Sequence, residues 1–444
     1  MRISVPDLIF GFSRALDMVK PQLAGHHLGV AWIASELGQA LSLPRTVRAQ
    51  LFTAAMLHDA GAIPLKVSAD DLLFERNTWL HTRAGWTLLS RCAFLRHAAS
   101  FVLFHHTPWR RLRDSGEALL PANLIHLADR AELFLRGGAL LDASALESHL
   151  ARHAGGKFHP DGVEALRALC ARRGGRLALP SAQEMKHDLQ TDCAQPDLDP
   201  DHLIPFCFLF SLITDFLSPF TATHTAGVAH TACILHRRHM LGTTGSVDPE
   251  ENRKVFVAGL LHDIGKLGVP RALLEKEGPL DHDEFAQMKR HAEFSLSLLD
   301  NIPGLEDIRL WGALHHERLN GRGYPLGLAG GQLPLPSRIM AVADIFTALM
   351  EDRPYRKGMS LARALDILQT MEDNGHIDGT VLATLRAEAE RINRVRAGAQ
   401  RRARRRFDEL YRICAEPVES DVRAFSACFN PPPPHPPTDS ASGR

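Results

Sequence analysis

The feature that most constrains the fold of this chain is an internal repeat. The sequence reads HHLGVAWIA and then MLHDAGAIPL in its first half, and HTAGVAHTA and then LLHDIGKLGVP in its second half. Each copy continues with one His, a His-His pair and an Asp in the same order, which is typical of a duplicated domain. The landmarks are His26, His58-Asp59, His81, His105-His106 and Asp129 in the first copy, and His224, His262-Asp263, His291, His315-His316 and Asp344 in the second.

Local patterns predict helices almost throughout both copies. Apolar residues from Phe285 to Leu298 recur at intervals that suit one face of a helix. Asp281 followed by Glu284 has the spacing of a capping box at the start of that helix. Alternating strand patterns with hairpin dipeptides are scarce. The sequence therefore predicts an all-α fold with two tandem helical bundles.

Composition shifts mark the domain boundaries. Residues 174–202 are polar and contain Pro180, Pro196 and Pro200, which predicts a linker between the two copies. The end of the chain, NPPPPHPPTDSASGR, cannot form a packed core and is expected to be disordered from about residue 430. The predicted organisation is a first domain at 1–173, the linker at 174–202, a second domain at 203–415 and a tail at 416–444.

Charge and cysteine usage exclude several classes of function. Lys plus Arg equals Asp plus Glu at 51 each, so no overall charge attracts a nucleic-acid polymer or a membrane surface. No apolar run is long enough to span a bilayer, and Asp7, Arg14 and Asp17 interrupt the N-terminal apolar pattern as a secretory signal would not. The seven cysteines form no CxxC pair, and the expected compartment is the cytoplasm. The basic stretch from Arg391 to Arg406 is interpreted as a solvated helix face.

The second copy has the residues of a metal centre. A single His on an apolar helix face is usually a core residue, but an ordered set of five His and two Asp exceeds what one metal ion needs. Two ions that share Asp263 as a bridging carboxylate fit this inventory. Nitrogen and oxygen ligands without thiolate suit iron, manganese or zinc-like ions, and a metal pair is a known device for phosphoryl displacement.

Three segments of the second copy carry a family resemblance. HDIGKLGVP at 262–270, HHERLNGRGYP at 315–325 and DIFTALMEDRPYRK at 344–357 resemble the HD-GYP family of cyclic di-GMP phosphodiesterases, over roughly residues 205–415. The resemblance implies that Lys266 contacts the scissile phosphate, that Gly323, Tyr324 and Pro325 form a loop near the substrate, and that Arg353 and Tyr355 contact phosphate or base. It also implies metal ligation by His224, His262, Asp263, His291, His315, His316 and Asp344.

Two departures from the family pattern lead to further expectations. Some relatives have a Glu one turn before the first His that supports a third metal, and Phe220 stands there, so two metals, iron or manganese, are expected. In the first copy Ala62 replaces the lysine, and no GYP loop follows. This copy is therefore interpreted as degenerate, either a packing partner or a regulator. A vestigial metal site is left open at His26, His58, Asp59, His81, His105, His106 and Asp129.

The expected function is hydrolysis of a cyclic dinucleotide, with Asp263 and Lys266 as the catalytic residues. Cyclic di-GMP is the first choice of substrate and a linear dinucleotide the first product, while a second cut to mononucleotides is left open. Three alternatives remain: 3',3'-cyclic GMP-AMP as substrate, another phosphoester as substrate, and a non-catalytic cyclic-dinucleotide receptor. Protein partners at the GYP loop and a homodimer are also open.

Overall fold

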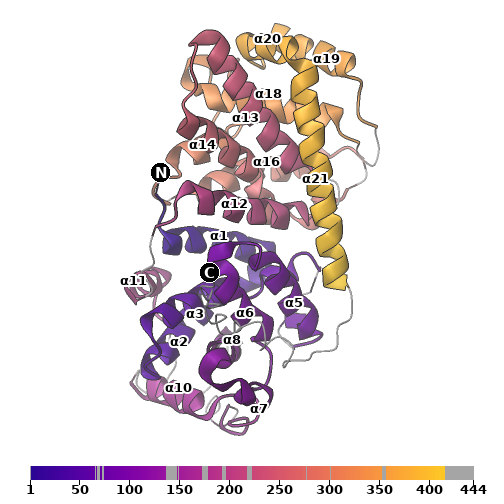
Figure 1. Cartoon of the computed structure of the whole chain (residues 1–444). Coiled ribbons are helices and arrows are strands. Elements are labelled where there is room, and N and C mark those ends of the chain that lie inside the picture. Colours follow the sequence, from indigo (N-terminus) through magenta and orange to yellow (C-terminus); the bar gives the residue numbers. More distant parts are fainter. Residues whose placement is uncertain are drawn as a thin grey trace, which may run out of the picture.

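The helices of the computed structural model form two bundles, one from each half of the chain (Figure 1). The structure describes residues 2–65, 67, 71–72, 75–136, 148, 150–172, 179–192, 197–217, 223–276, 278–300, 302–352 and 357–415. Within these ranges extended backbone pairs only at isolated bridges, such as Ile3 with Leu198. The all-α prediction is therefore confirmed. None of the helices in these ranges has the length and apolarity that a membrane crossing requires.

The first bundle places the first set of landmarks at helix ends and on helix faces. His26 opens the second helix directly after Gly25, which has a φ of +75°. His58 and Asp59 follow the last turn of the third helix and lead into a short 3-10 turn, η2 (Ala60–Ala62). The main helices are α2 (His26–Ala40), α3 (Arg45–Leu57), α5 (Thr78–Leu89), α6 (Arg96–Phe104), α8 (Leu120–Arg136) and α10 (Pro160–Arg172).

The second bundle repeats this order. His224 opens a helix, His262 and Asp263 end one and lead into the 3-10 turn η5 (Ile264–Gly268), and His291 lies on the inner face of another. The tandem organisation predicted from the repeat is thus confirmed. Its helices are α13 (His224–Thr243), α14 (Pro249–Leu261), α16 (His282–Leu298), α17 (Glu306–Ala313), α18 (Leu335–Met350), α19 (Leu361–Asp373), α20 (Gly379–Ala387) and α21 (Ala389–Ala415).

The start of α16 agrees with the prediction from the sequence, whereas the face of this helix that is buried differs from the predicted one. Asp281 and Glu284 form the predicted capping box, with each side chain accepting a backbone N–H of the other residue. The predicted apolar face is partly wrong, because Phe285 is 48% exposed. The face that is buried carries His291 and Ser295 beside apolar residues. An apolar periodicity cannot mark this face, because its buried residues include the polar side chains of His291 and Ser295.

One glycine in each bundle allows the His-Asp turn to lie directly on the next helix. A Cβ on Gly265 would fall 2.0 Å from the carbonyl oxygen of His291, and one on Gly61 would fall 2.1 Å from that of His81. No side chain fits at these distances, so both positions require glycine for close backbone approach. This contact brings the His-Asp pair next to the following histidine in both halves.

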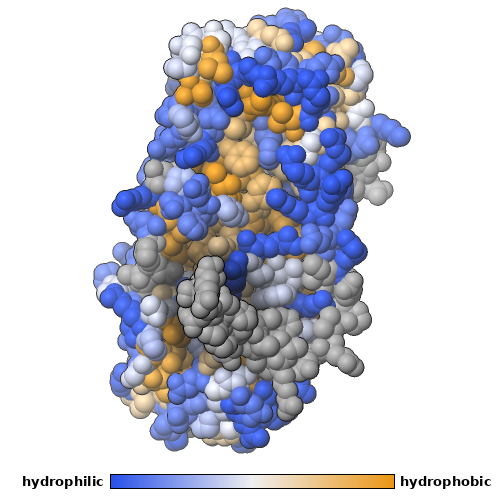
Figure 2. Space-filling model, in the orientation of Figure 1, coloured by the Kyte–Doolittle hydropathy of each residue, from blue (hydrophilic) through white to orange (hydrophobic). Residues whose placement is uncertain are grey.

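The two bundles meet at α1 (Val5–Val19) and α12 (Pro200–Asp215), which lie between them in Figure 1. The Phe12 ring packs against those of Phe206 and Phe210, at centroid distances of 4.8 and 4.0 Å. One cluster of buried apolar residues continues from the first bundle through this junction into the second. Figure 2 shows apolar residues gathered near the middle of the molecule among a largely hydrophilic surface. The bundles therefore share a core.

The segment predicted as a linker contains a helix that packs on the first bundle. This helix, α11 (Ala182–Asp192), buries Met185 and Leu189, and its Asp192 forms an ion pair with Arg48 at 2.7 Å. The sequence of the segment is polar because only one face of the helix is covered. The prediction of a disordered tail concerns residues that lie outside the described part of the chain.

The basic stretch on α21 is mostly solvated, as interpreted, with one exception. Arg401 to Arg406 place their arginines at the surface, whereas Arg396 is only 5% exposed and bonds Asn393 and Gln400. In Figure 1 this helix runs down from the second bundle to reach the first. Part of this basic stretch therefore packs against the rest of the protein, although its charge alone predicts a solvated helix face.

Candidate metal centre

Asp263 lies at the centre of the buried His-Asp cluster in the second bundle. Its carboxylate oxygens are 3.2 Å from His262 Nε2, 3.5 Å from His291 Nε2 and 4.0 Å from His315 Nε2. Burial would raise the pKa of Asp263, but Lys266 and His262 hold it well below its ordinary value. The carboxylate is therefore ionised and central, as a bridging ligand must be.

The remaining predicted ligands surround this carboxylate from separate helices. His224, His262 and Asp344 offer ligand atoms within 4.8 Å of one another, and so do His291, His315 and His316. These residues come from α13, α14, α16, α18 and the turn after α17. All seven residues predicted from the sequence are thus brought together. These two groups of donors lie on either side of Asp263, and the number of ions that they hold stays a prediction.

Backbone carbonyls fix the tautomers of three of these histidines. The Nδ1 atoms of His262, His291 and His315 lie 2.7 to 2.8 Å from the carbonyl oxygen three residues earlier. Each Nδ1 therefore carries the proton, and each Nε2 presents a lone pair to the cluster. Burial lowers the pKa of His291 and His315, which keeps both rings neutral. Neutral imidazole is the form that binds metals.

Buried atoms without partners indicate that the cluster fits a metal. His262 Nε2, His291 Nε2 and Asp263 Oδ1 are buried and make no hydrogen bond. Leaving such groups unsatisfied costs about 1–3 kcal/mol each, so a native protein keeps them for a purpose. Metal ions would satisfy all three, and the donor set of imidazole and carboxylate suits transition metals.

His224 is held by a carboxylate that the sequence analysis did not identify. Its Nδ1 lies 2.9 Å from Glu351 and its Nε2 lies 3.0 Å from Asp344. Burial alone would lower the pKa of His224, but these carboxylates raise it to about 10, so binding of a metal ion at Nε2 would displace a proton from this ring. Gln400 on α21 in turn donates to Glu351. The outer carboxylate orients the histidine, as is common around metal ligands.

Replacing Glu351 with glutamine should weaken metal binding without removing a ligand. The substitution keeps the shape but removes the charge that orients His224, and such outer-shell changes typically cost about 10- to 100-fold in metal affinity. Competition with a chelator, followed by metal analysis, measures the effect. Glu293→Gln, at an exposed position on α16, is the matched control. Unchanged affinity in Glu351→Gln would contradict a role for this carboxylate in metal binding.

The loop of the GYP motif is folded against the cluster. The Tyr324 ring lies over His316 at a centroid distance of 4.6 Å, and the following peptide bond to Pro325 is cis. Gly323 leaves no room for a side chain, because a Cβ there would lie 2.4 Å from the Glu317 Cα. The buried Glu317 carboxylate accepts three backbone N–H groups from residues 326–328, at 2.6 to 3.0 Å. This loop therefore presents one wall of the site.

The other predicted site residues are placed only in part. The ammonium of Lys266 forms an ion pair with Asp263 at the cluster. Arg353, Tyr355 and Phe220 lie outside the described residues, so the predictions about substrate contacts and a missing third ligand stay predictions.

Two residues besides Glu351 support the cluster and are not marked by any motif that the sequence analysis used. Glu317 folds the GYP loop, and its place next to His316 in HHERLNGRGYP could have drawn attention to it. Asp215 accepts a hydrogen bond from Thr225 at 2.7 Å and interacts electrostatically with His224, but no motif marks it. Both residues contact neighbours of the cluster, and neither lies at a sequence spacing that predicts such a contact.

The first bundle also gathers its seven landmarks. Asp59, His81, His105 and His106 offer ligand atoms within 4.8 Å of one another, and His26 and His58 form a second group with Asp59. His26 Nε2 lies 3.4 Å from Asp129. Ala62, where the second bundle has its lysine, is buried beside this cluster.

Two helical bundles, each with a buried His-Asp pair among further histidines, define a tandem HD-domain protein. The HD domain family matches residues 217–381, and a second HD domain match covers residues 23–133. Such domains are metal-dependent, which agrees with the donor sets described above.

Relatives of known activity are similar over most of the chain. The 3'3'-cGAMP-specific phosphodiesterase 1 of Vibrio cholerae is 31% identical over 85% of this chain and 90% of its own length. A cyclic di-GMP phosphodiesterase of Pseudomonas aeruginosa is 42% identical over 29% of this chain and 31% of its own length. The crystal structure of a Vibrio cholerae cyclic GMP-AMP phosphodiesterase is 23% identical, with a TM-score of 0.60 over 88% of this chain and 98% of that one, which supports the fold.

The chain therefore belongs to the HD-GYP family of cyclic-dinucleotide phosphodiesterases, as the resemblance of its motifs predicts.

Proposed function

We propose that this chain hydrolyses 3',3'-cyclic GMP-AMP to a linear dinucleotide. Similarity that extends over both halves carries the proposal, because a 3'3'-cGAMP-specific phosphodiesterase matches 85% of the chain. A second 3'3'-cGAMP-specific enzyme of Vibrio cholerae is 28% identical over 86% of it. The cyclic di-GMP expected first from the motifs has less support than this alternative.

Cyclic di-GMP remains the second candidate substrate. A cyclic di-GMP phosphodiesterase is 42% identical over 130 residues, a higher identity than either relative that matches most of the chain. That similarity is confined to 29% of this chain, whereas the tandem architecture extends over the whole of it. The shared segment supports common phosphodiester chemistry, and the tandem architecture favours the mixed dinucleotide.

We propose the following roles for the residues of the His-Asp cluster in the second bundle and for their neighbours. Two metal ions would be held by the seven His and Asp side chains, and their Lewis acidity would activate water and neutralise phosphate charge. Asp263 would position the ions relative to each other. Lys266, beside Asp263, would donate to a phosphate oxygen as charge develops, while the 3'-oxygen leaves. Tyr324 would support the substrate from the GYP loop.

Side-by-side turnover of the two dinucleotides tests the choice of substrate. The full chain would be purified anaerobically and assayed with added manganese or ferrous iron. We expect kcat/KM for 3',3'-cyclic GMP-AMP to exceed that for cyclic di-GMP by at least about tenfold, which corresponds to roughly 1.4 kcal/mol, the order of a single hydrogen bond to a base. Equal or reversed values would contradict the proposed preference, while hydrolysis of neither would contradict the proposed activity.

A further inference from the structure

A cavity lies where α21 passes the helices that join the two bundles. It has a volume of about 540 Å³, within the range of roughly 300–1,000 Å³ that is usual for small-molecule sites. Its walls come from α12, α13, α14 and α21, and from Arg91, which follows α5. In Figure 1, α21 runs along these helices from the second bundle down to the first. None of the His-Asp landmarks lines the cavity, so it is a separate site.

One face of α21 contributes two arginines and two alanines to this cavity. Residues at intervals of three and four lie on the same side of a helix, and here they are Ala399, Arg402, Ala403 and Arg406. Both alanines are buried, and their short side chains leave room beside the arginines. The other arginines of the RRARRR segment are exposed and do not line the cavity. The basic stretch is therefore divided into a side that faces the cavity and sides that face solvent.

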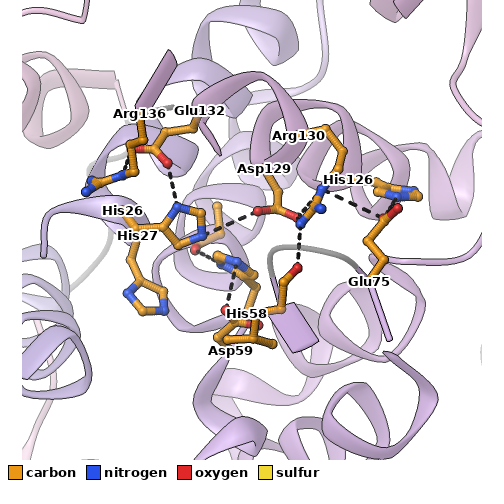
Figure 3. Close-up of polar contacts among 12 residues, drawn as sticks. His26, His27, His58, Asp59, Glu75, His126, Asp129, Arg130, Glu132 and Arg136 are labelled. Carbon is orange, nitrogen blue, oxygen red and sulfur yellow. Dashed lines mark hydrogen bonds and ion pairs between the residues drawn. The ribbon is translucent and has the colours of Figure 1, made fainter. Parts of the chain in front are cut away.

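The charge of the two cavity arginines is not neutralised within the described part of the chain. Figure 3 shows the opposite arrangement in the first bundle, where Arg130 lies between Asp129 and Glu75 and its Nη2 is 2.6 Å from Asp129 Oδ2. Among the described residues, no carboxylate pairs with Arg402 or Arg406, and none lines the cavity. Positive charge that gathers around a cavity without a counter-charge attracts an anionic ligand.

Two further polar side chains line the cavity. Arg91 adds a third cation; it pairs with Glu409 at 3.3 Å, but both side chains are exposed, and such surface pairs contribute little. His230 Nδ1 lies 2.9 Å from the carbonyl oxygen of Ala226, so Nδ1 carries the proton and Nε2 is an acceptor. Burial, and less strongly the nearby arginines, lower the pKa of His230, which keeps its ring neutral. The cavity therefore offers three cations and a neutral acceptor.

Aromatic rings from other helices complete the cavity. The basic stretch from Arg391 to Arg406 contains no aromatic residue, but α12 and α14 place Phe208 and Phe256 at the cavity, and neither ring is fully buried. Arg406 Cζ lies 5.0 Å from the centroid of the Phe208 ring, and the His230 ring meets Phe256 edge to face at 5.0 Å. Phenyl rings beside arginines suit a nucleotide, because a base stacks on the rings while phosphates accept hydrogen bonds from guanidinium groups.

The turn of α21 that forms the cavity also contacts the supports of the metal centre. Gln400 in this turn donates to Glu351, which lies 2.9 Å from His224 Nδ1. The helices α21 and α13 pack closely there, because a Cβ on Gly227 would lie 2.8 Å from Gln400 Nε2. The arrangement of α21 that forms the cavity is therefore the one that holds Glu351 on His224. A ligand that binds this arrangement stabilises both features.

We propose that this cavity binds a nucleoside polyphosphate and that the bound ligand stabilises the orientation of His224 in the metal centre. The phosphates would accept hydrogen bonds from the three arginines, and the base would stack on a phenyl ring of the cavity. More than one phosphate fits best, because three cations meet there and no carboxylate lines the described part of the cavity. This site goes beyond the proposed hydrolysis and does not depend on the choice of substrate.

Calorimetric titration of the full chain with GTP tests the site. The double variant Arg402→Ala/Arg406→Ala should bind GTP at least about tenfold more weakly than the wild type, because one charge-assisted hydrogen bond typically accounts for about that factor. The matched control is Arg404→Ala/Arg405→Ala, which removes the same charge from exposed positions outside the cavity and should bind as the wild type does. Equal affinities of all three proteins, or no binding by the wild type, would overturn the proposal.

Tripolyphosphate as a second probe separates the nucleoside from the phosphates. GTP should bind at least about fivefold more tightly than tripolyphosphate, since stacking of one base on an aromatic ring accounts for about that factor or more. Phe256→Leu should remove most of this difference and leave the affinity for tripolyphosphate unchanged. Equal binding of the two probes by the wild type would reduce the cavity to an anion site and overturn the assignment of a nucleoside.

Loss of metal to a chelator tests the link to His224 without any assay of turnover. Bound GTP should slow this loss about fivefold, at the lower end of the usual coupling between two sites. GTP itself binds metal ions, so the same measurement on Arg402→Ala/Arg406→Ala provides the baseline. An equal effect of GTP on the variant and on the wild type would overturn the coupling, and this outcome would leave the proposed hydrolysis intact.

Discussion

Replacing Asp263 with alanine should reduce kcat for cyclic-dinucleotide hydrolysis by about 10³-fold or more, equivalent to roughly 4 kcal/mol of lost transition-state stabilisation. Asp263 approaches three histidines, with carboxylate oxygens 3.2, 3.5 and 4.0 Å from their Nε2 atoms. Its removal would leave these imidazoles without the negative charge that would hold the two proposed cations close together. Turnover of 3',3'-cyclic GMP-AMP and metal analysis of the same sample measure the effect.

Matched variants separate this loss from a general effect on folding. Asp263→Asn keeps the shape of the side chain and should lose activity to a similar extent, because the amide cannot replace the negative charge. Asp283→Ala, at an exposed position on α16, should retain wild-type turnover. A variant at Asp263 that kept more than a tenth of the wild-type kcat would contradict the central role of this carboxylate.

The residues of the two buried clusters could be predicted from the sequence because each lies at a landmark of the repeat. In both bundles a glycine two residues after the His-Asp pair lets this turn lie directly on the next helix, because a Cβ at Gly265 would clash with the backbone of that helix. The first bundle has the same order of residues, with Gly61 in the place of Gly265, so the sequence contains each landmark twice. Order along the chain was therefore enough to predict which histidines converge.

The supporting residues could not be predicted in the same way. Glu351 reaches His224 from the far end of α18, and Gln400 reaches Glu351 from α21. Such contacts depend on how the helices pack against one another, and the spacing of residues along the sequence does not predict this packing. The docking of α11 is similar, because its Asp192 meets Arg48 far away in the sequence. Glu75 likewise bonds His126 across a gap of 51 residues.

Replacing Lys266 with alanine should lower kcat by about 10²- to 10³-fold, as loss of one donor to developing charge typically does. The ammonium lies at Asp263 and is available to a phosphate oxygen bound to the same centre. Because Lys266 carries no lone pair for a metal, the metal content of the variant should equal that of the wild type. KM should change little, since the interaction strengthens as the reaction proceeds.

Metal content distinguishes a direct role of Lys266 from an indirect one. If the lysine acted only by holding Asp263 in place, its removal would release metal together with activity. Lys254→Ala removes a surface lysine that pairs with Asp307 and should leave both values unchanged. Full metal content with a large loss of kcat is therefore the result that assigns Lys266 to the phosphate. Loss of both would assign it to the support of Asp263, as Glu351 supports His224.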